Sequence, residues 1–196
     1  MMPSDPPVRQ PNLIAFRLHL GNRCVSCEVL TFHPRLVDLL NAAHGHEMMV
    51  NNVSVQRIVA AKAETTEAEI GSIGTAAILW AAPVEAPGAV QVRDAYAHVR
   101  KRPFPVRVSM GQCELVGNIH LPEGSDLRDW LTATGPMFAV MTDAVVERID
   151  TGSITAEAVV VFNRERADAI LPAGPRTGEA KMVIGATEWQ ERGSDI

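Results

Sequence analysis

The cysteines have the spacing most suggestive of chemistry in this sequence. Cys24 and Cys27 form a Cys-x-x-Cys pair, which can hold zinc or cycle between thiol and disulfide when it opens a helix or occupies a turn. Here the pair falls in a predicted strand, where residues three apart point to opposite faces. Cys113 aligns with Cys24 in a second, similar stretch, and no second Cys-x-x-Cys pair occurs. We therefore interpret the cysteines as small core residues, with a metal or redox site as the alternative.

Histidines form a second candidate group. The run His44-Gly45-His46 falls in a predicted turn, from which its imidazoles could reach a metal together with Glu47. His33 and His120 lie near equivalent turns of the two similar stretches. The second stretch has Gly135-Pro136 where the first has the histidines. Because the run is not shared, we interpret it as an exposed loop, and we expect no bound metal and no cofactor.

Two aspartates recur near predicted helix starts. Asp38 and Asp129 could satisfy backbone donors there and interact with the positive end of the helix dipole. Catalysis by either carboxylate would need a partner acid or histidine at fixed geometry, and the sequence supplies none in both stretches. The sequence also contains no glycine-rich phosphate loop, nucleophile elbow or metalloprotease motif. We therefore expect no catalytic residues and no enzymatic activity.

One basic cluster stands out in an acidic chain. Arg100, Lys101 and Arg102 follow one another, with Tyr96 nearby, although the net charge is -5. That overall charge argues against a protein built to wrap nucleic acid, which needs a strongly basic face. The cluster remains the best candidate for a site of interaction with a partner. A solvated linker is the alternative interpretation.

The same pattern occurs twice along the chain. The phrase Leu-x-Asp-x-Leu at 36–40 returns at 127–131, and several later residues match in the same order. The matching pairs are Asn52 with Asp143, Gln56-Arg57-Ile58 with Glu147-Arg148-Ile149, and Gly71-Ser72-Ile73 with Gly152-Ser153-Ile154. Upstream, the residues up to Cys24 align with those up to Cys113 after a gap of one residue. We infer a tandem duplication.

The second copy predicts the elements of one unit. Apolar and polar residues alternate as in half-buried strands, interrupted by turn residues and by one short apolar helix. Strands are predicted at 106–110, 113–121, 138–141, 144–149 and 154–162, and a helix at 127–133, capped by Ser125 or Asp126. The first copy adds an acidic stretch at 62–69, which we expect in an exposed hairpin loop.

The predicted fold class is mainly β, with two tandem small β-barrels, each with one short helix, and extended tails. The strand order, with Gly117, Asp129 and Thr142-Asp143, resembles Sm-like and SH3-like barrels. The phrase Gly-x-Ile-His-Leu-Pro followed by Leu-x-Asp-x-Leu is similar to bacterial proteins of unknown function. The resemblance implies a fold and no activity. Sm-like RNA sites use an Asp-x-x-x-Asn phrase where this chain has a helix, and Asn163-Arg164 only loosely matches their basic-glycine phrase, so RNA binding does not carry over.

These patterns divide the chain into five parts. We expect a proline-rich tail at 1–12, a first barrel at 13–82, a linker with the basic cluster at 83–103, a second barrel at 104–171, and a C-terminal tail at 172–196. Neither tail contains enough apolar residues to form a core. Within the second tail, Met182, Ile184 and Trp189 are candidate anchors on a partner protein.

The remaining features favour a cytoplasmic accessory protein. The start of the chain lacks the basic and apolar regions of a secretory signal, and residues 76–83 are too short to span a bilayer. Three cysteines, an odd number, favour reduced thiols. We predict a non-enzymatic scaffold subunit that docks onto partner proteins, including those at the cytoplasmic face of a membrane complex. An Sm-like RNA-binding module, and a metal or redox protein using Cys24 and Cys27, are the alternatives.

Overall fold

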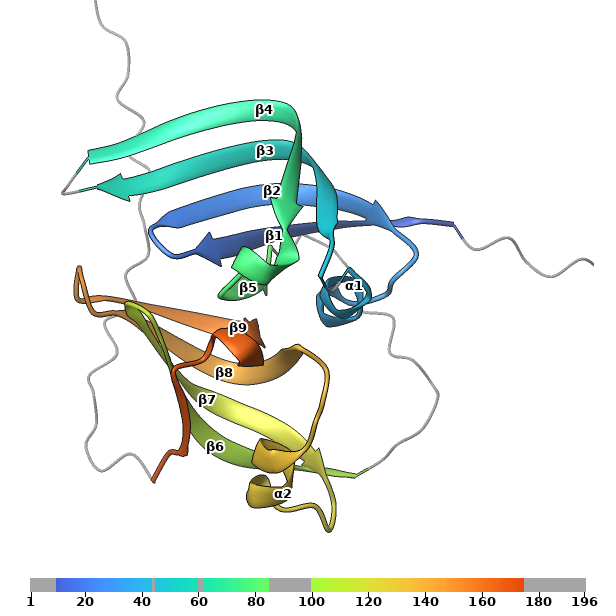
Figure 1. Cartoon of the computed structure of the whole chain (residues 1–196), viewed down its shortest axis with the longest axis vertical. Helices are drawn as coiled ribbons and strands as arrows, with labels where there is room; N and C mark the ends of the chain where they lie inside the picture. The colour runs from blue at the N-terminus through green and yellow to red at the C-terminus, as the bar shows by residue number, and fades with distance from the viewer. Residues whose placement is uncertain (1–9, 44, 60–61, 85–99, 175–196) are drawn as a thin grey trace, which may run out of the picture.

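A mainly β architecture is confirmed by the computed structural model, which describes residues 10–43, 45–59, 62–84 and 100–174. Its strands form one antiparallel sheet of 10 strands in the order β10-β6-β7-β8-β9-β5-β1-β2-β3-β4. The sheet bends around two helices, with the first half of the chain above the second in Figure 1. Strands β5 and β9 lie side by side between the halves and join them into one sheet.

The two halves contain the same elements in the same order. The first half comprises β1 (Asn12–Leu20), β2 (Arg23–Thr31), α1 (Leu36–Ala42), β3 (Glu47–Val59), β4 (Lys62–Gly74), the 3-10 turn η1 (Thr75–Ala77) and β5 (Trp80–Pro83). The second comprises β6 (Lys101–Met110), β7 (Cys113–Pro122), α2 (Leu127–Thr132), β8 (Phe138–Arg148), β9 (Ser153–Asn163), the 3-10 turn η2 (Arg164–Arg166) and β10 (Ala169–Pro172). In each half the first strand pairs with both the second and the fifth.

A matching polar contact supports the correspondence between the halves. Asn52 in β3 and Asp143 in β8 both have a positive φ, 50° and 51°, a conformation that favours short polar residues. Asn52 Nδ2 donates to Glu28 Oε2 at 2.8 Å, and Asn118 Nδ2 donates to Asp143 Oδ2 at 3.2 Å. The same two positions are therefore linked in each half, with donor and acceptor exchanged.

The strand register corrects the alignment of the cysteines. Leu20 pairs with Arg23 in the first hairpin, and Met110 pairs with Cys113 in the equivalent hairpin. Both hairpins have two-residue turns, so no gap separates the two copies at this point. Cys113 therefore occupies the position of Arg23, and the predicted match between Cys113 and Cys24 was wrong.

The acidic stretch at 62–69 also differs from its predicted role. It forms the start of β4 instead of a hairpin loop, and it pairs with β3 from Lys62 opposite Val59 to Ala68 opposite Val53. Side chains from Glu64 to Ile70 are exposed on both faces of this arm. Backbone pairing with β3 and the β-branched Thr65 and Thr66 favour an extended strand here, although no core covers the arm.

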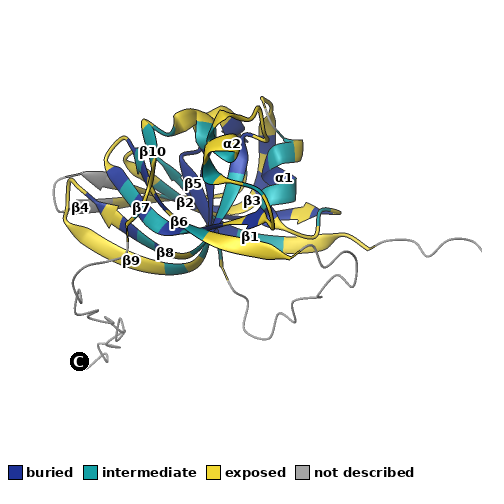
Figure 2. Ribbon diagram, turned by 90° about the horizontal axis from the view of Figure 1, so that it is seen from below, coloured by how far each residue is buried: buried dark blue, intermediate teal, exposed yellow. Residues whose placement is uncertain are grey.

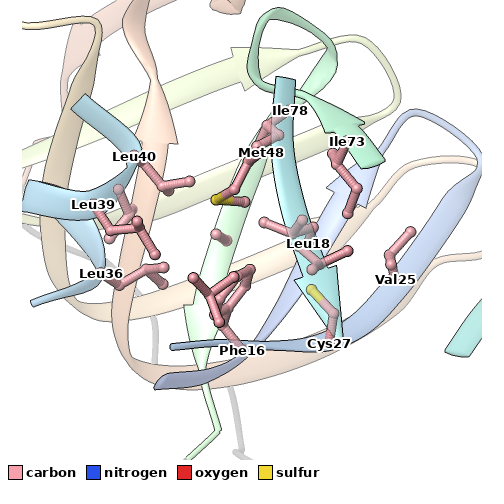
Figure 3. Packing of buried hydrophobic residues seen from close by; sticks show 14 of the residues in the cluster. Phe16, Leu18, Val25, Cys27, Leu36, Leu39, Leu40, Met48, Ile73 and Ile78 are labelled. Carbon is pink, nitrogen blue, oxygen red and sulfur yellow. The ribbon is translucent and has the colours of Figure 1, made fainter. Parts of the chain in front are cut away.

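The hydrophobic cores of the two halves are interleaved at the junction. In the first core, Leu36, Leu39 and Leu40 of α1 pack towards Phe16 of β1, as Figure 3 shows. This core also contains residues from the second half, namely Met137, Phe138 and Val161. In return, the second core contains Leu79, Trp80 and Ala82 from the β5 region. Each half thus buries side chains of the other.

Helix α2 begins at one of its predicted caps, but the predicted barrels are not closed. Asp126 caps α2 by accepting hydrogen bonds from the backbone nitrogens of Arg128 and Asp129, as one of the two predicted caps. At the ends of the sheet, β4 pairs only with β3 and β10 pairs only with β6 among the described residues. The strand pairing therefore describes a single open sheet.

Candidate functional site

The basic cluster lies on a strand. Lys101 and Arg102 begin β6 and pair with Pro122 and Leu121 of β7, while Arg100 directly precedes the strand. All three basic residues are exposed. The guanidinium carbon of Arg102 lies 5.8 Å from the centre of the Phe104 ring, a cation–π contact. The cluster is thus a set of solvent-facing cations with a fixed backbone, which begins within the predicted linker and continues into the second half.

The other predicted partner-binding residues lie outside the described residues. These are Tyr96 in the predicted linker and Met182, Ile184 and Trp189 in the predicted C-terminal tail.

A surface that the sequence analysis missed lies on the first half. Large hydrophobic side chains project outward there, and we call Leu13, Leu30, Phe32, Met49 and Ile70 the outer apolar patch. Their exposed fractions are 61%, 61%, 63%, 62% and 63% respectively. Such exposure is ordinary for a scattered side chain but is meaningful when several neighbours share one face.

Strand pairing places the four strand residues of the patch on neighbouring strands of one face. Leu13 of β1 pairs directly with Leu30 of β2, so both side chains point to the same face. Ile70 of β4 pairs with Asn51 of β3, which in turn pairs with Glu28 of β2, two residues from Leu30. The exposed start of β1 is visible in Figure 2. Leu13, Leu30, Met49 and Ile70 therefore lie on β1 to β4, and Phe32 directly follows the end of β2.

A sequence signal for the patch exists in pairs of consecutive apolar residues. Leu13 is followed by Ile14, and Met48 is followed by Met49. Because successive side chains on a strand point to opposite faces, one member of each pair must face away from the core. Ile14 packs against the first core and Met48 is buried in it, which leaves Leu13 and Met49 on the outer face.

A second cluster lies at the junction of the halves. The imidazole of His19 stacks on the indole of Trp80, with ring centres 3.6 Å apart. On its other side, His19 Nε2 lies 3.7 Å from the Cys24 thiol. Trp80 Nε1 is buried and has no hydrogen-bond partner among the described residues. Burial raises the pKa of the Cys113 thiol, and the Trp80 side chain opposes this shift.

Electrostatics keep this junction cluster uncharged. Burial, with smaller contributions from Arg17 and Arg148, lowers the pKa of His19 from 6.5 to about 3. Burial also raises the pKa of Cys24. At neutral pH the pair is therefore a neutral imidazole beside a neutral thiol, which lacks the thiolate that nucleophilic or redox chemistry requires.

The Cys-x-x-Cys pair lies in strand β2, as the sequence predicts. Cys24 is half-buried beside His19, whereas Cys27 is buried in the first core, where burial raises the pKa of its thiol to about 12. Among the described residues, no group of three or more His, Cys, Asp or Glu side chains could hold a metal ion. His44 lies outside the described residues, and His46 is exposed. The structure thus does not bring the cysteines and His46 together.

The recurring aspartates take part in local contacts. Asp38 Oδ2 accepts from Arg35 Nε at 2.8 Å within the first turn of α1. Asp129 lies in the first turn of α2, and its backbone nitrogen donates to the Asp126 cap at 3.0 Å. Both aspartates thus lie in the first turn of a helix, as the sequence predicts, but neither is the capping residue.

A depression in the described surface lies at the same junction. Its volume is about 670 Å³, and it lies between the β1–β2 and β6–β7 turns and the two 3-10 turns. Its lining includes Asn22, Leu79, Gln112 and Asp168. Asp168 Oδ2 accepts from the backbone nitrogen of Gly111 at 2.6 Å, so this carboxylate holds the β6–β7 turn.

Comparison with known proteins gave no relative. No family model, no curated protein and no solved structure matches this chain. None of the helices in the described parts of the chain is long and apolar enough to cross a membrane. The proposed function is therefore based on the arrangement of the surface.

Proposed function

We propose that this protein is a non-enzymatic scaffold or accessory subunit that docks onto partner proteins in a larger assembly. The outer apolar patch is the observation that carries this proposal. Four of its five side chains lie on β1 to β4, on one face of the first half, where water would otherwise cover them. Burying such a surface against a partner is favourable at about 25 cal/mol per Å² of apolar area. Contiguous exposed apolar surfaces often mark protein interfaces.

The fold supports a scaffold in a second way. We interpret the open sheet as two copies of an Sm-like or SH3-like small-barrel unit, joined along β5 and β9. The matching element order and the exchanged Glu28–Asn52 and Asn118–Asp143 contacts support this interpretation. The odd number of cysteines favours reduced thiols and so a cytoplasmic setting, including the cytoplasmic face of a membrane complex.

The size of the native complex tests the proposal. We expect the full chain, extracted gently from its own cells, to migrate well above its mass of 21.2 kDa. Leu30→Glu should return it to the free form, because a charge cannot be buried in an apolar interface without a large desolvation cost. Ile154→Glu, at a 68% exposed site outside the patch, is the matched control. A wild-type chain that always migrates as a free monomer would overturn the proposal.

The basic cluster supports one second candidate, an RNA-binding module. Arg100, Lys101 and Arg102 are exposed at the start of β6, where they could contact phosphates. RNA binding would then weaken steeply with salt and disappear when all three become glutamate. Retained binding by that triple variant would remove the cluster as the cause, and indifference to RNA at low salt would remove this function.

A further inference from the structure

The contact between the two halves uses different edges of the repeated unit. The fifth strand of the first unit, β5, pairs with the fourth strand of the second, β9, through Trp80 opposite Phe162 and Ala81 opposite Val161. Asn163 strengthens this contact, since its backbone nitrogen donates to Leu79 O at 2.8 Å and its Nδ2 donates to Ile78 O at 3.1 Å. Because the two edges differ, such an interface can be repeated by further copies.

The counterparts of these two edges lie at the two ends of the sheet. They are β10, the fifth strand of the second unit, and β4, the fourth strand of the first, and each pairs on one side only among the described residues. We propose that β10 of one chain takes β4 of a second copy in antiparallel pairing. The internal register then places Ala169 opposite Ile73 and Ile170 opposite Ser72. This inference rests on the proposed scaffold function and names one partner of the outer apolar patch.

Exposed apolar side chains lie at the positions that the internal contact buries. Leu171 of β10 is 52% exposed, whereas Ala82 at the same position of β5 is fully buried against the second core. On the other edge, Met49 is 62% exposed, whereas its counterpart Val140 packs against the first core. Ile70 is 63% exposed at the position of Val159. Both free edges thus present apolar side chains where a neighbouring copy would cover them.

In the contact between two chains, opposite charges would stand where the internal contact has apolar and amide side chains. In the internal contact, Asn41 of α1 bonds to the backbone of Phe138, with distances of 3.0 and 2.9 Å. The counterpart of Phe138 on the free edge is Glu47, which is exposed. The counterpart of Asn41 is Thr132 of α2, and Arg128 lies one helical turn before it on the same face. Glu47 of one copy would therefore meet the basic side chain of Arg128 in the other.

Polar residues along β4 should limit the contact between chains to the apolar end of this strand. Glu64, Glu67 and Glu69 lie along β4, and charged residues discourage strand addition at an open edge. His46, Glu47 and Ser72 also replace the apolar Met137, Phe138 and Val161. The contact between chains should therefore be weaker than the internal one and should form and dissociate with concentration.

Cysteine cross-linking between two single variants tests the register. The full chain carrying Ser72→Cys is mixed with the full chain carrying Ile170→Cys under mild oxidation. We expect the mixed disulfide to form about tenfold faster than with Ile154→Cys, since pairing raises the effective concentration of the two thiols. Ile154 is the matched control because it is exposed and far from both edges in the strand order. Equal rates for the two mixtures would overturn the inference.

A charge exchange provides the second readout. Glu47→Arg and Arg128→Glu should each abolish the concentration-dependent dimer in native mass spectrometry, and an equimolar mixture of the two variants should restore a mixed dimer. A wild-type chain that stays monomeric at its highest soluble concentration would also overturn the inference. If that monomer still enters a larger native complex through Leu30, the scaffold function stands while self-association fails.

Discussion

The imidazole of His19 lies flat on the indole of Trp80, with ring centres 3.6 Å apart and ring planes only 10° from parallel. His19 comes from β1 and Trp80 from β5, and the two residues pair across these strands. Trp80 also belongs to the second core. The stack therefore places a titratable group at the line where the two halves of the molecule meet.

Protonation of His19 should destabilise the folded protein. Burial lowers the pKa of His19 in the folded state to about 3, whereas the unfolded chain has a pKa near 6.5. Between these values the unfolded chain binds the extra proton, so stability is fully present above pH 6.5 and is lost as pH falls towards 3. The loss should approach about 1.4 kcal/mol per pH unit within this window. Urea unfolding at a series of pH values measures it.

The variant His19→Gln identifies the source of that slope. Glutamine cannot titrate, so the dependence of unfolding free energy on pH should become shallower by about 1.4 kcal/mol per unit between pH 6 and pH 4. His120→Gln, at an exposed site on β7, is the matched control substitution. An unchanged slope in His19→Gln would show that another group titrates.

Gly117 of β7 should not tolerate a methyl group. A Cβ at this position would lie 2.8 Å from the carbonyl oxygen of Thr142 and 2.7 Å from Met141 Cγ, both too close. Gly117→Ala should therefore destabilise the protein by about 1–3 kcal/mol. Gly74→Ala, where no atom lies within 4 Å, should change stability by no more than about 0.5 kcal/mol. Thermal unfolding of both variants provides the comparison, and equal stabilities would contradict this packing.

Asn41 should hold the two halves together. Its side chain both donates to and accepts from the backbone of Phe138, which belongs to the other half. Asn41→Ala leaves two partly buried backbone groups without partners and should cost about 1–3 kcal/mol. Asn118→Ala removes an exposed contact within the second half and should cost much less. Chemical unfolding of the two variants distinguishes them, and a larger loss in Asn118→Ala would be inconsistent with the junction described.

The three thiols should react slowly in the folded protein. Burial raises the pKa of Cys27 to about 12 and raises the pKa values of Cys24 and Cys113. Alkylation near pH 8 requires the thiolate, so labelling should be slow until the chain unfolds. Mass spectrometry of labelled native and urea-treated protein measures the difference. Rapid native labelling of Cys24 or Cys27 would instead favour the redox alternative.

Local patterns predicted much of the fold. The expected helix at 127–133 corresponds to α2, and the expected strand at 154–162 corresponds to β9, because alternation and turn residues identify both. The expected strands at 138–141 and 144–149 are one strand, β8, in which Asp143 adopts a positive φ without ending the pairing. The polar residues there mark a local distortion of the strand.

Local sequence patterns did not predict the pairing between the halves or the outer apolar patch. The pairing of β5 with β9 joins residues about eighty apart, and no local pattern specifies such a contact. The exposed acidic arm of β4 lacks the buried face that makes a strand recognisable. The exposure of Leu13 and Met49 was not predicted, since apolar type alone does not show which face of a strand is covered.

Photo-cross-linking in the protein's own cells tests the docking function most directly. A photoreactive side chain replaces Leu30 at the centre of the outer apolar patch, and the same group replaces Ile154 as the exposed control. The proposed function predicts a discrete cross-linked product from position 30, containing a partner protein or a second copy of this chain, and no such product from position 154. Cross-links that are absent at position 30, or equally abundant at both positions, would contradict it.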